Sequence, residues 1–401
     1  MLKSFRKLVK QFQSVPEREF RNGRTKDQTL EYIGSLQEES GKVQELRRHI
    51  YAHDPDIRRA AVSALKDLEW ESESAADKQL WAMSMGDWPE GDDVSADSLL
   101  TAWEAETSLA PGAYWTPVVL AGLTAKGEGA KPGLYPVAQD SNRSMNTRTL
   151  ALWAIGLIGE QDGQALREVY DQQVNQRIQR STIQALRFCG PHMASVLRAI
   201  LEKEEDEELC LELALAWARM GKEVVSGLGD LLGSDKRRLR EYTGLAILAA
   251  ADPQGLSWLS NFKSSDRDGR LKALITEWMI ALQGDASTWE ELSSPRTASG
   301  LCSSERILQG MTRVDNDLLD CILVSQLAHV PGEGAVPVLQ EIIRTTDREE
   351  LIFEACQAMG TLRARAELQA FLDQGNPLIR TYACLALLAA GFPVMQVLAE
   401  S

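Results

Sequence analysis

The feature that most constrains this chain is a helical pattern that recurs at a near-constant spacing. Segments beginning at Thr147, Ile178, Leu209 and Leu239 place small or apolar residues four, seven and eight positions further on, which is one face of a helix. A fifth begins at Gly269, so successive starts are 31, 31, 30 and 30 residues apart. A period of about 30 residues fits two short helices and two turns. The pattern predicts an all-α stack of helical hairpins.

Turn residues mark where the second helix of each hairpin begins and ends. Asp54, Asp235 and Asn376 stand where N-caps belong, because their side chains can accept hydrogen bonds from the first turn. Glycine, which tolerates the left-handed backbone of a helix end, is expected to close five second helices. These are Gly159, Gly190, Gly221, Gly360 and Gly391.

The clearest copies carry the string D-x-x-I-R-x-x-A-x-x-A-L, at Asp54–Leu65 and, with Asn in first place, at Asn376–Leu387. This string resembles HEAT repeats, and the short period is similar to the HEAT-like subtype of phycobilisome lyases. The resemblance implies a right-handed α-solenoid of roughly nine to eleven hairpins. The family spans scaffolds, chromophore lyases, a metal-dependent hydroxylase and a DNA glycosylase, so it does not fix an activity.

The repeat pattern predicts a division of the chain into five segments. We expect a basic amphipathic helix with a linker or cap over residues 1–36, and a first HEAT-like repeat over 37–69. Residues 70–142 hold degenerate repeats and an acidic loop, 143–283 the regular repeats, and 284–401 the C-terminal repeats.

Catalytic signatures are missing from the sequence. There is no phosphate-binding G-x-x-x-x-G-K-[ST], no G-x-S-x-G, no H-E-x-x-H and no C-x-x-C. None of the four histidines precedes a glutamate, so the chain departs from the His-Glu pairs of the HEAT-like hydroxylase. We therefore expect no catalytic residue, no cofactor and no metal.

Charge and hydropathy limit the classes of partner that we expect this chain to bind. The net charge of −15 argues against nucleic acid, which needs a surplus of Lys and Arg. No apolar run approaches the about 18 residues of a membrane span, and no secretory signal is recognised, so a cytoplasmic location is expected. Residues 1–13 place Leu2, Phe5, Leu8 and Phe12 on one helical face among four basic residues. This segment suits a partner, an anionic membrane surface or a cap on the first repeat.

The helical register predicts a concave stripe of side chains next to the core-facing positions. Apolar and aromatic groups there suit a partner's helix or peptide, although tight curvature would instead bury them against neighbouring second helices. The stripe consists of Leu152, Trp153, Ile183, Arg187, Leu215, Leu245, Leu248 and Trp278.

A second set is the recurrent arginine of the repeat: Arg58, Arg148, Arg240 and Arg380. By the HEAT resemblance, each pairs with the turn aspartate of a neighbouring repeat, and an anion-binding ladder is the alternative. Together these features favour a non-catalytic scaffold or adaptor that binds another protein on its concave surface, within a bacterial complex. The alternatives are a chromophore lyase-type protein and, against the acidic charge, a DNA glycosylase-type enzyme.

Overall fold

The computed structural model describes most of the chain between residues 26 and 392. The described residues are 26–36, 43–50, 55–70, 78, 95–107, 116–221, 224, 227–264, 267–283, 287–299, 302–311, 316–329, 334–372 and 376–392. They form 22 α-helices and four short 3-10 helices, with no strand among them. The prediction of an all-α protein is confirmed. The amphipathic segment predicted over residues 1–13 lies outside this part of the chain.

The chain divides into two compact units. Unit 1 comprises residues 1–154 and 366–401, and unit 2 comprises residues 155–365. One division falls inside α9 (Met145–Ile158) and the other at the start of α24 (Arg365–Leu372). Each unit is considered by itself below.

Unit 1 begins with a small group of helices in which α2 and α3 both pack on α4. Its other described helices include α6 and α8, which contact each other, and α7 and α25, which also pack together. The bounds are α2 Lys26–Leu36, α3 Val43–His49, α4 Pro55–Asp67, α6 Ala96–Thr107, α7 Thr116–Ala125, η3 Gly127–Ala130, α8 Lys131–Gln139 and α25 Pro377–Ala389.

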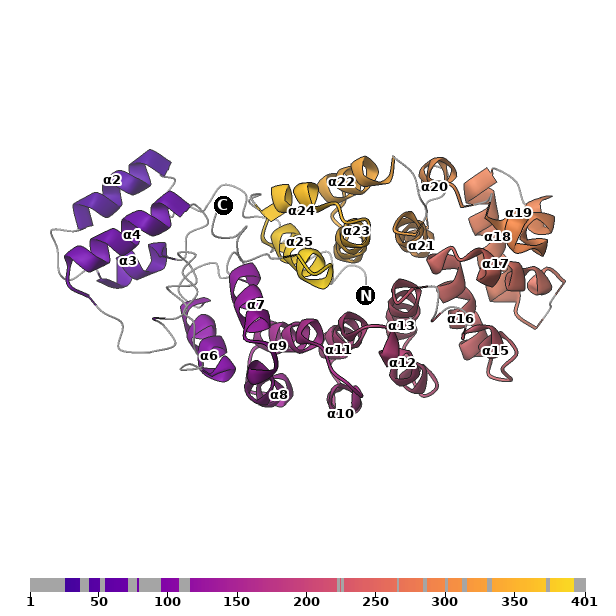
Figure 1. Cartoon of the computed structure of the whole chain (residues 1–401), viewed down its shortest axis with the longest axis horizontal. Coiled ribbons are helices and arrows are strands. Elements are labelled where there is room, and N and C mark those ends of the chain that lie inside the picture. Colours follow the sequence, from indigo (N-terminus) through magenta and orange to yellow (C-terminus); the bar gives the residue numbers. More distant parts are fainter. Residues whose placement is uncertain are drawn as a thin grey trace. The chain divides into compact units, whose positions relative to one another are not determined.

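Unit 2 is a succession of helical hairpins (Figure 1). Its first part holds α10 Gln164–Gln172, α11 Gln176–Cys189, η4 Pro191–Met193, α12 Ala194–Leu201, α13 Glu207–Arg219, α15 Gly229–Leu232, α16 Arg237–Ala250, α17 Pro253–Leu259, η5 Ser260–Phe262 and α18 Gly269–Gln283. Its second part holds η6 Ser287–Ser293, α19 Pro295–Ala298, α20 Ser304–Met311, α21 Asp317–Leu327, α22 Ala335–Thr345 and α23 Glu349–Thr361.

The predicted period matches the second helices of the hairpins. Helices α9, α11, α13, α16 and α18 begin at residues 145, 176, 207, 237 and 269, within two residues of the five predicted starts. Within unit 2, α11 packs on α13, α13 on α16 and α16 on α18. These helices thus begin 31, 31, 30 and 32 residues apart.

Most glycine predictions are confirmed. Gly159, Gly190, Gly221 and Gly391 follow their helices with φ between 76° and 111°. Gly360 is the exception, because α23 continues through it to Thr361 and Arg363 takes the positive φ of 56°.

Of the predicted N-caps, Asn376 is confirmed, since its side chain accepts from the backbone N–H groups of Leu378 and Ile379. The prediction for Asp235 is wrong, because Lys236 occupies the N-cap of α16 and offers no capping side chain. Arg267 donates to both the carbonyl and the carboxylate of Asp235. Asp235 is thus bonded to the turn that precedes α18.

The second part of unit 2 packs back on the first. Helix α21 contacts α13 and α16, and α23 packs on α21 (Figure 1). At the centre, the buried Trp278 indole donates to Gln326 Oε1 over 3.2 Å, and Gln326 Nε2 donates to the Leu248 carbonyl over 2.7 Å. This side of α16 and α18 is thus covered by a later helix of the same unit.

Among the described residues, no helix is both long and apolar enough to cross a bilayer.

Candidate functional site

The eight residues of the predicted concave stripe all lie in the protein interior. Their exposed fractions run from 0% for Leu152, Ile183, Leu248 and Trp278 to 9% for Arg187. The burial matches the alternative in which these side chains pack against neighbouring helices.

The stripe residues are not gathered into one patch. In unit 1, Trp153 meets Tyr382 edge to face, with ring centroids 6.2 Å apart. In unit 2, Gln326 joins Trp278 to Leu248 through the two hydrogen bonds given above. Leu245 also borders a groove that opens to the surface.

Arg187 belongs to a buried ionic cluster that joins α11, α13 and α23. Its Nη1 lies 3.1 Å from Oε1 of Glu354, while Nη2 of Arg219 lies 2.7 Å from the other carboxylate oxygen. Arg219 also donates to the backbone carbonyl of Glu354 over 3.0 Å. All three side chains are at most 7% exposed. One carboxylate thus serves two guanidinium groups in the core.

The electrostatics of this cluster depend on both arginines. Burial by itself raises the pKa of Glu354, but attraction by Arg219 and Arg187, with their hydrogen bonds, outweighs it and lowers the pKa below its usual value. Nearby, burial raises the pKa of Glu212, although Arg180 and a hydrogen bond from Gln184 oppose that rise. The pKa values of the two buried carboxyl groups are therefore shifted in opposite directions, that of Glu354 downward and that of Glu212 upward.

Neither Arg219 nor Glu354 was predicted from the sequence as a site residue. A signal was present, because each stands as a lone charge in an otherwise apolar helical run, LALAWAR and LIFEACQAM. A charge at a core-facing position is rarely buried without a partner. The sequence gives no means of telling which distant residue that partner is.

The recurrent arginines divide into two kinds. Arg240 confirms the expected pairing, because its Nη2 lies 2.8 Å from the buried carboxylate of Asp268 in the next hairpin. Nε of Arg148 and Nε of Arg380 instead donate to the carbonyls of Ala138 and Leu372, over 3.0 and 2.6 Å. The side chain of Arg58 lies outside the described residues.

The surface feature that the structure adds is an apolar groove in unit 2. We call it the leucine groove. It has a volume of about 380 Å³, and its apolar lining consists mainly of Leu211 of α13, Leu245 of α16, Leu271 and Leu274 of α18, and Leu318 of α21. Leu245 and Leu271 are buried and form its floor, whereas the other three are half-buried. The floor residue Leu245 was predicted from the sequence, whereas the groove itself was not.

The rim of the leucine groove is acidic. Four carboxylates line it, from Glu207, Glu208, Glu241 and Glu277. Three of them pair with arginines: Glu207 with Arg270, Glu208 with Arg180 and Glu241 with Arg237. Glu207 and Glu208 stand in the first turn of α13, the end of a helix at which negative side chains are favoured. The groove combines an apolar floor with a rim rich in carboxylates, three of which are paired with arginines.

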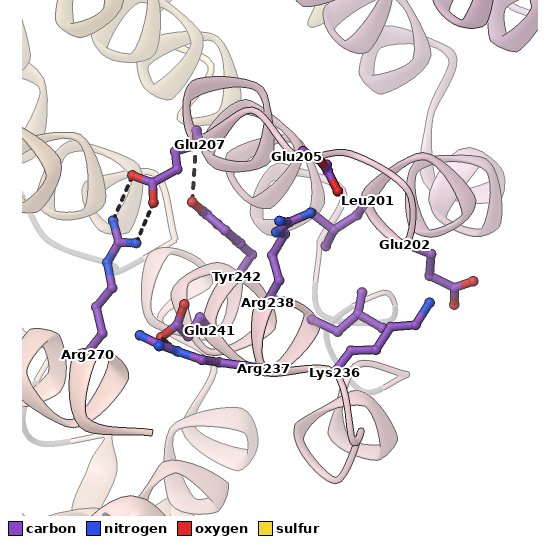
Figure 2. Close-up of a pocket in the computed structure, with 11 residues that line it drawn as sticks. Leu201, Glu202, Glu205, Glu207, Lys236, Arg237, Arg238, Glu241, Tyr242 and Arg270 are labelled. Carbon is purple, nitrogen blue, oxygen red and sulfur yellow. Dashed lines mark hydrogen bonds and ion pairs between the residues drawn. The ribbon is translucent and has the colours of Figure 1, made fainter. Parts of the chain in front are cut away.

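A polar depression of about 430 Å³ adjoins the groove and shares its Glu207, Glu241, Tyr242 and Arg270. Figure 2 shows Arg270 reaching Glu207 through two hydrogen bonds, of 2.9 and 3.2 Å. The Tyr242 hydroxyl donates to the Glu207 carbonyl over 3.4 Å (Figure 2). The hydrogen bonds with Arg270 lower the pKa of Glu207.

The charges of this depression are largely matched within it. Arg237 pairs with Glu241 over 2.8 Å, and Arg238 donates to the carbonyl of Glu204. The depression thus has mixed charge, and the leucine groove is the more distinctive of the two.

Within the described part of the chain, no group of His, Cys, Asp and Glu side chains is arranged to hold a metal ion. Comparison of the chain with protein-family models and with curated protein sequences found no match to either.

Proposed function

We propose that this protein is a non-catalytic helical-repeat scaffold that binds a basic amphipathic helix of a protein partner in the leucine groove. In this proposal the hairpins stack as a right-handed HEAT-like solenoid, and the protein acts as an adaptor in the bacterial cytoplasm. The observation that carries it is the apolar floor of the groove beneath four rim carboxylates.

The groove chemistry selects the class of partner. Half-buried leucines on three neighbouring helices offer apolar area to side chains spaced along one face of a helix. The rim favours a ligand whose flanking residues are Lys or Arg, because opposite charges attract and like charges are rejected. A nucleic acid or an acidic peptide would meet the wrong charge at this rim.

A model ligand tests the groove directly. We expect a fluorescent leucine/lysine helical peptide of about 18 residues to bind the full-length protein, with an affinity that falls as salt rises. The peptide with glutamate in place of lysine should not bind. Fluorescence anisotropy at several salt concentrations measures both.

Substitutions in the wall of the leucine groove test whether the peptide binds there. Leu274→Lys with Leu318→Lys places two positive charges on its wall, so affinity for the lysine peptide should fall at least about tenfold. Ile280→Lys is the matched control, since Ile280 lies on the same helix as Leu274, is 39% exposed and is not part of the groove. Equal binding by both variants, or equal binding of the two peptides, would refute the proposal.

A further inference from the structure

One carboxylate on the rim of the leucine groove differs from the other three. Glu207, Glu208 and Glu241 each lie within 3.4 Å of an arginine, whereas Glu277 forms no ion pair with any residue that the structure describes. Glu277 is exposed on α18, and its carboxylate Oε2 accepts a hydrogen bond of 2.9 Å from Nδ2 of Asn316. The rim therefore offers one negative charge that a ligand can reach without displacing an arginine.

Asn316 fixes the place of that carboxylate while it caps α21. Its Oδ1 accepts from the backbone N–H groups of Leu318 and Leu319, over 3.0 and 3.2 Å, which leaves Nδ2 free to donate to Glu277. An aspartate would also cap the helix, but it would bring a second negative charge against Glu277. Because one amide makes both contacts, the Glu277 carboxylate is tied to the first turn of α21.

The carboxylate lies beside the apolar wall of the groove. Glu277 follows Leu274 by three residues on α18, so the two share one face of that helix, and Leu318 follows Asn316 by two residues. Both leucines are half-buried and line the groove. A lysine or arginine of a ligand can lay its methylene stem on such leucines while its charged end stays at the edge, in the reach of Glu277.

We infer that Glu277 is the residue by which the leucine groove selects a basic ligand, and that Asn316 positions it. The inference rests on the proposed function and deepens it, because it names the place where one Lys or Arg of the partner's helix binds. That residue stands at the edge of the partner's apolar face, next to the side chains that pack on Leu274 and Leu318. The three paired carboxylates contribute less, because a ligand must first separate each of them from its arginine.

A double-mutant cycle tests the contact with Glu277. Two helical peptides of leucine and glutamine, each of about 18 residues, differ by one lysine at the edge of the leucine face. Fluorescence anisotropy gives their affinities for the full-length protein. The lysine should tighten binding by about two- to fivefold, the range of an exposed ion pair, and Glu277→Gln should abolish this gain.

Glu208→Gln is the matched control for Glu277→Gln. It removes one negative charge from the same rim, but a charge that is paired with Arg180, so the gain from the peptide lysine should survive. Any effect of the net charge of the protein is common to the two variants.

Asn316→Ser tests the positioning role. Serine can cap α21 but lacks the amide that bonds to Glu277, so the gain from the lysine should fall while the affinity for the lysine-free peptide stays the same. In the Glu277→Gln background the same change should have no further effect on the gain. Equal weakening of both peptides would show that Asn316 acts only on the fold, and would overturn its assigned role.

The outcomes separate this inference from the proposed function. A gain that survives Glu277→Gln, a gain that Glu208→Gln removes equally, or no gain from the lysine would each overturn the selection by Glu277. Binding of the leucine/lysine peptide in the groove would then leave the proposed function standing. Failure of that peptide to bind the unmodified chain would overturn the proposed function itself.

Discussion

Glu354 on α23 and Arg219 on α13 form an ion pair across 135 residues of sequence, with 2.7 Å between Oε2 and Nη2 and side chains 3% and 2% exposed. The carboxylate also receives Arg187, so it is the shared counter-charge of two buried cations. A group in this position stabilises the fold chiefly because its loss would leave those cations unpaired.

Glu354→Gln should therefore destabilise unit 2 strongly. The amide keeps the shape of the side chain but removes the negative charge, and breaking a buried pair in this way typically costs about 3–5 kcal/mol. Urea denaturation followed by circular dichroism measures the loss. Glu241→Gln is the control, because its partner Arg237 is exposed and such pairs contribute about 0–1 kcal/mol. A loss no greater than that of the control would contradict this account.

Lowering the pH should change the contributions of Glu354 and Glu212 to the stability of the fold in opposite directions. The folded pKa of Glu354 is lowered, so its stabilisation is present above its unfolded pKa, about 4.3, and is lost as pH falls through the folded value. The folded pKa of Glu212 is raised, so its contribution is complete below about pH 4.3 and is lost as pH rises through the folded value.

The matched variants follow from these signs. At pH 7, Glu212→Gln should be as stable as the unmodified chain or more so, and its advantage should vanish as pH falls to about 4. The deficit of Glu354→Gln should shrink over more acidic pH. Denaturation midpoints between pH 7 and pH 3 measure both, and a large loss from Glu212→Gln at pH 7 would show that its carboxylate is also ionised in the fold.

A close helix crossing makes Gly156 irreplaceable. A Cβ atom there would lie 2.5 Å from the carbonyl oxygen of Ala185 and 2.6 Å from its Cα, both backbone atoms of α11. Gly156→Ala should cost about 1–3 kcal/mol or more, since the two helices must separate. Gly34→Ala in α2 meets no atom within 4 Å and should instead stabilise its helix by about 0.5–1 kcal/mol. Thermal unfolding of the two variants provides the comparison.

The uncapped start of α16 is open to improvement. Lys236 has φ −77° and ψ 113°, close to the −73° and 124° of Asp206, whose side chain caps α13. Lys236→Asp should therefore add about 1 kcal/mol, through a capping bond and a better charge at the helix N-terminus. Asn376→Ala should lose a similar amount from α25. Chemical denaturation checks both, and a destabilised Lys236→Asp would show that the lysine has a role of its own.

Cysteine alkylation should single out Cys189. Burial raises the pKa of Cys210, Cys302, Cys321 and Cys384 to about 12, which leaves little thiolate at pH 8. Cys189 is half-buried and should react first with iodoacetamide, as followed by mass spectrometry. Early alkylation of any of the five buried thiols, Cys356 included, would indicate that unit 2 or α25 opens readily.

The sequence predicted what depends on neighbours along the chain. Apolar spacing located the second helices, and glycine identified four helix ends, because both effects act within one or two turns. The Gly360 prediction failed because α23 closes through a bond from the Ala364 N–H to the Met359 carbonyl, which places the left-handed residue at Arg363. The Asp235 prediction failed because α16 begins one residue later than expected, so that Lys236 stands at its N-cap.

The features that could not be predicted depend on contacts between residues that are far apart in the sequence. The helical register alone cannot tell whether Leu248 and Trp278 face an open concavity or a later helix, and α21 with Gln326 decides that. The partners Arg187 and Glu354 are 167 residues apart. The leucine groove likewise needs Leu318 of α21 beside α18, which no spacing within the repeat specifies.

The return of α23 to α11 changes how unit 2 can come apart. In an open array each hairpin touches only its neighbours, so a terminal repeat can peel away by losing one interface. Here the contacts run from α11 through α13, α16, α21 and α23, and the pair of Arg187 with Glu354 brings them back to α11. In such a closed circuit no hairpin can unfold by losing one interface alone. We expect its hairpins to unfold together, or only after the ionic cluster has broken, because the buried carboxylate of Glu354 connects the two ends of the circuit.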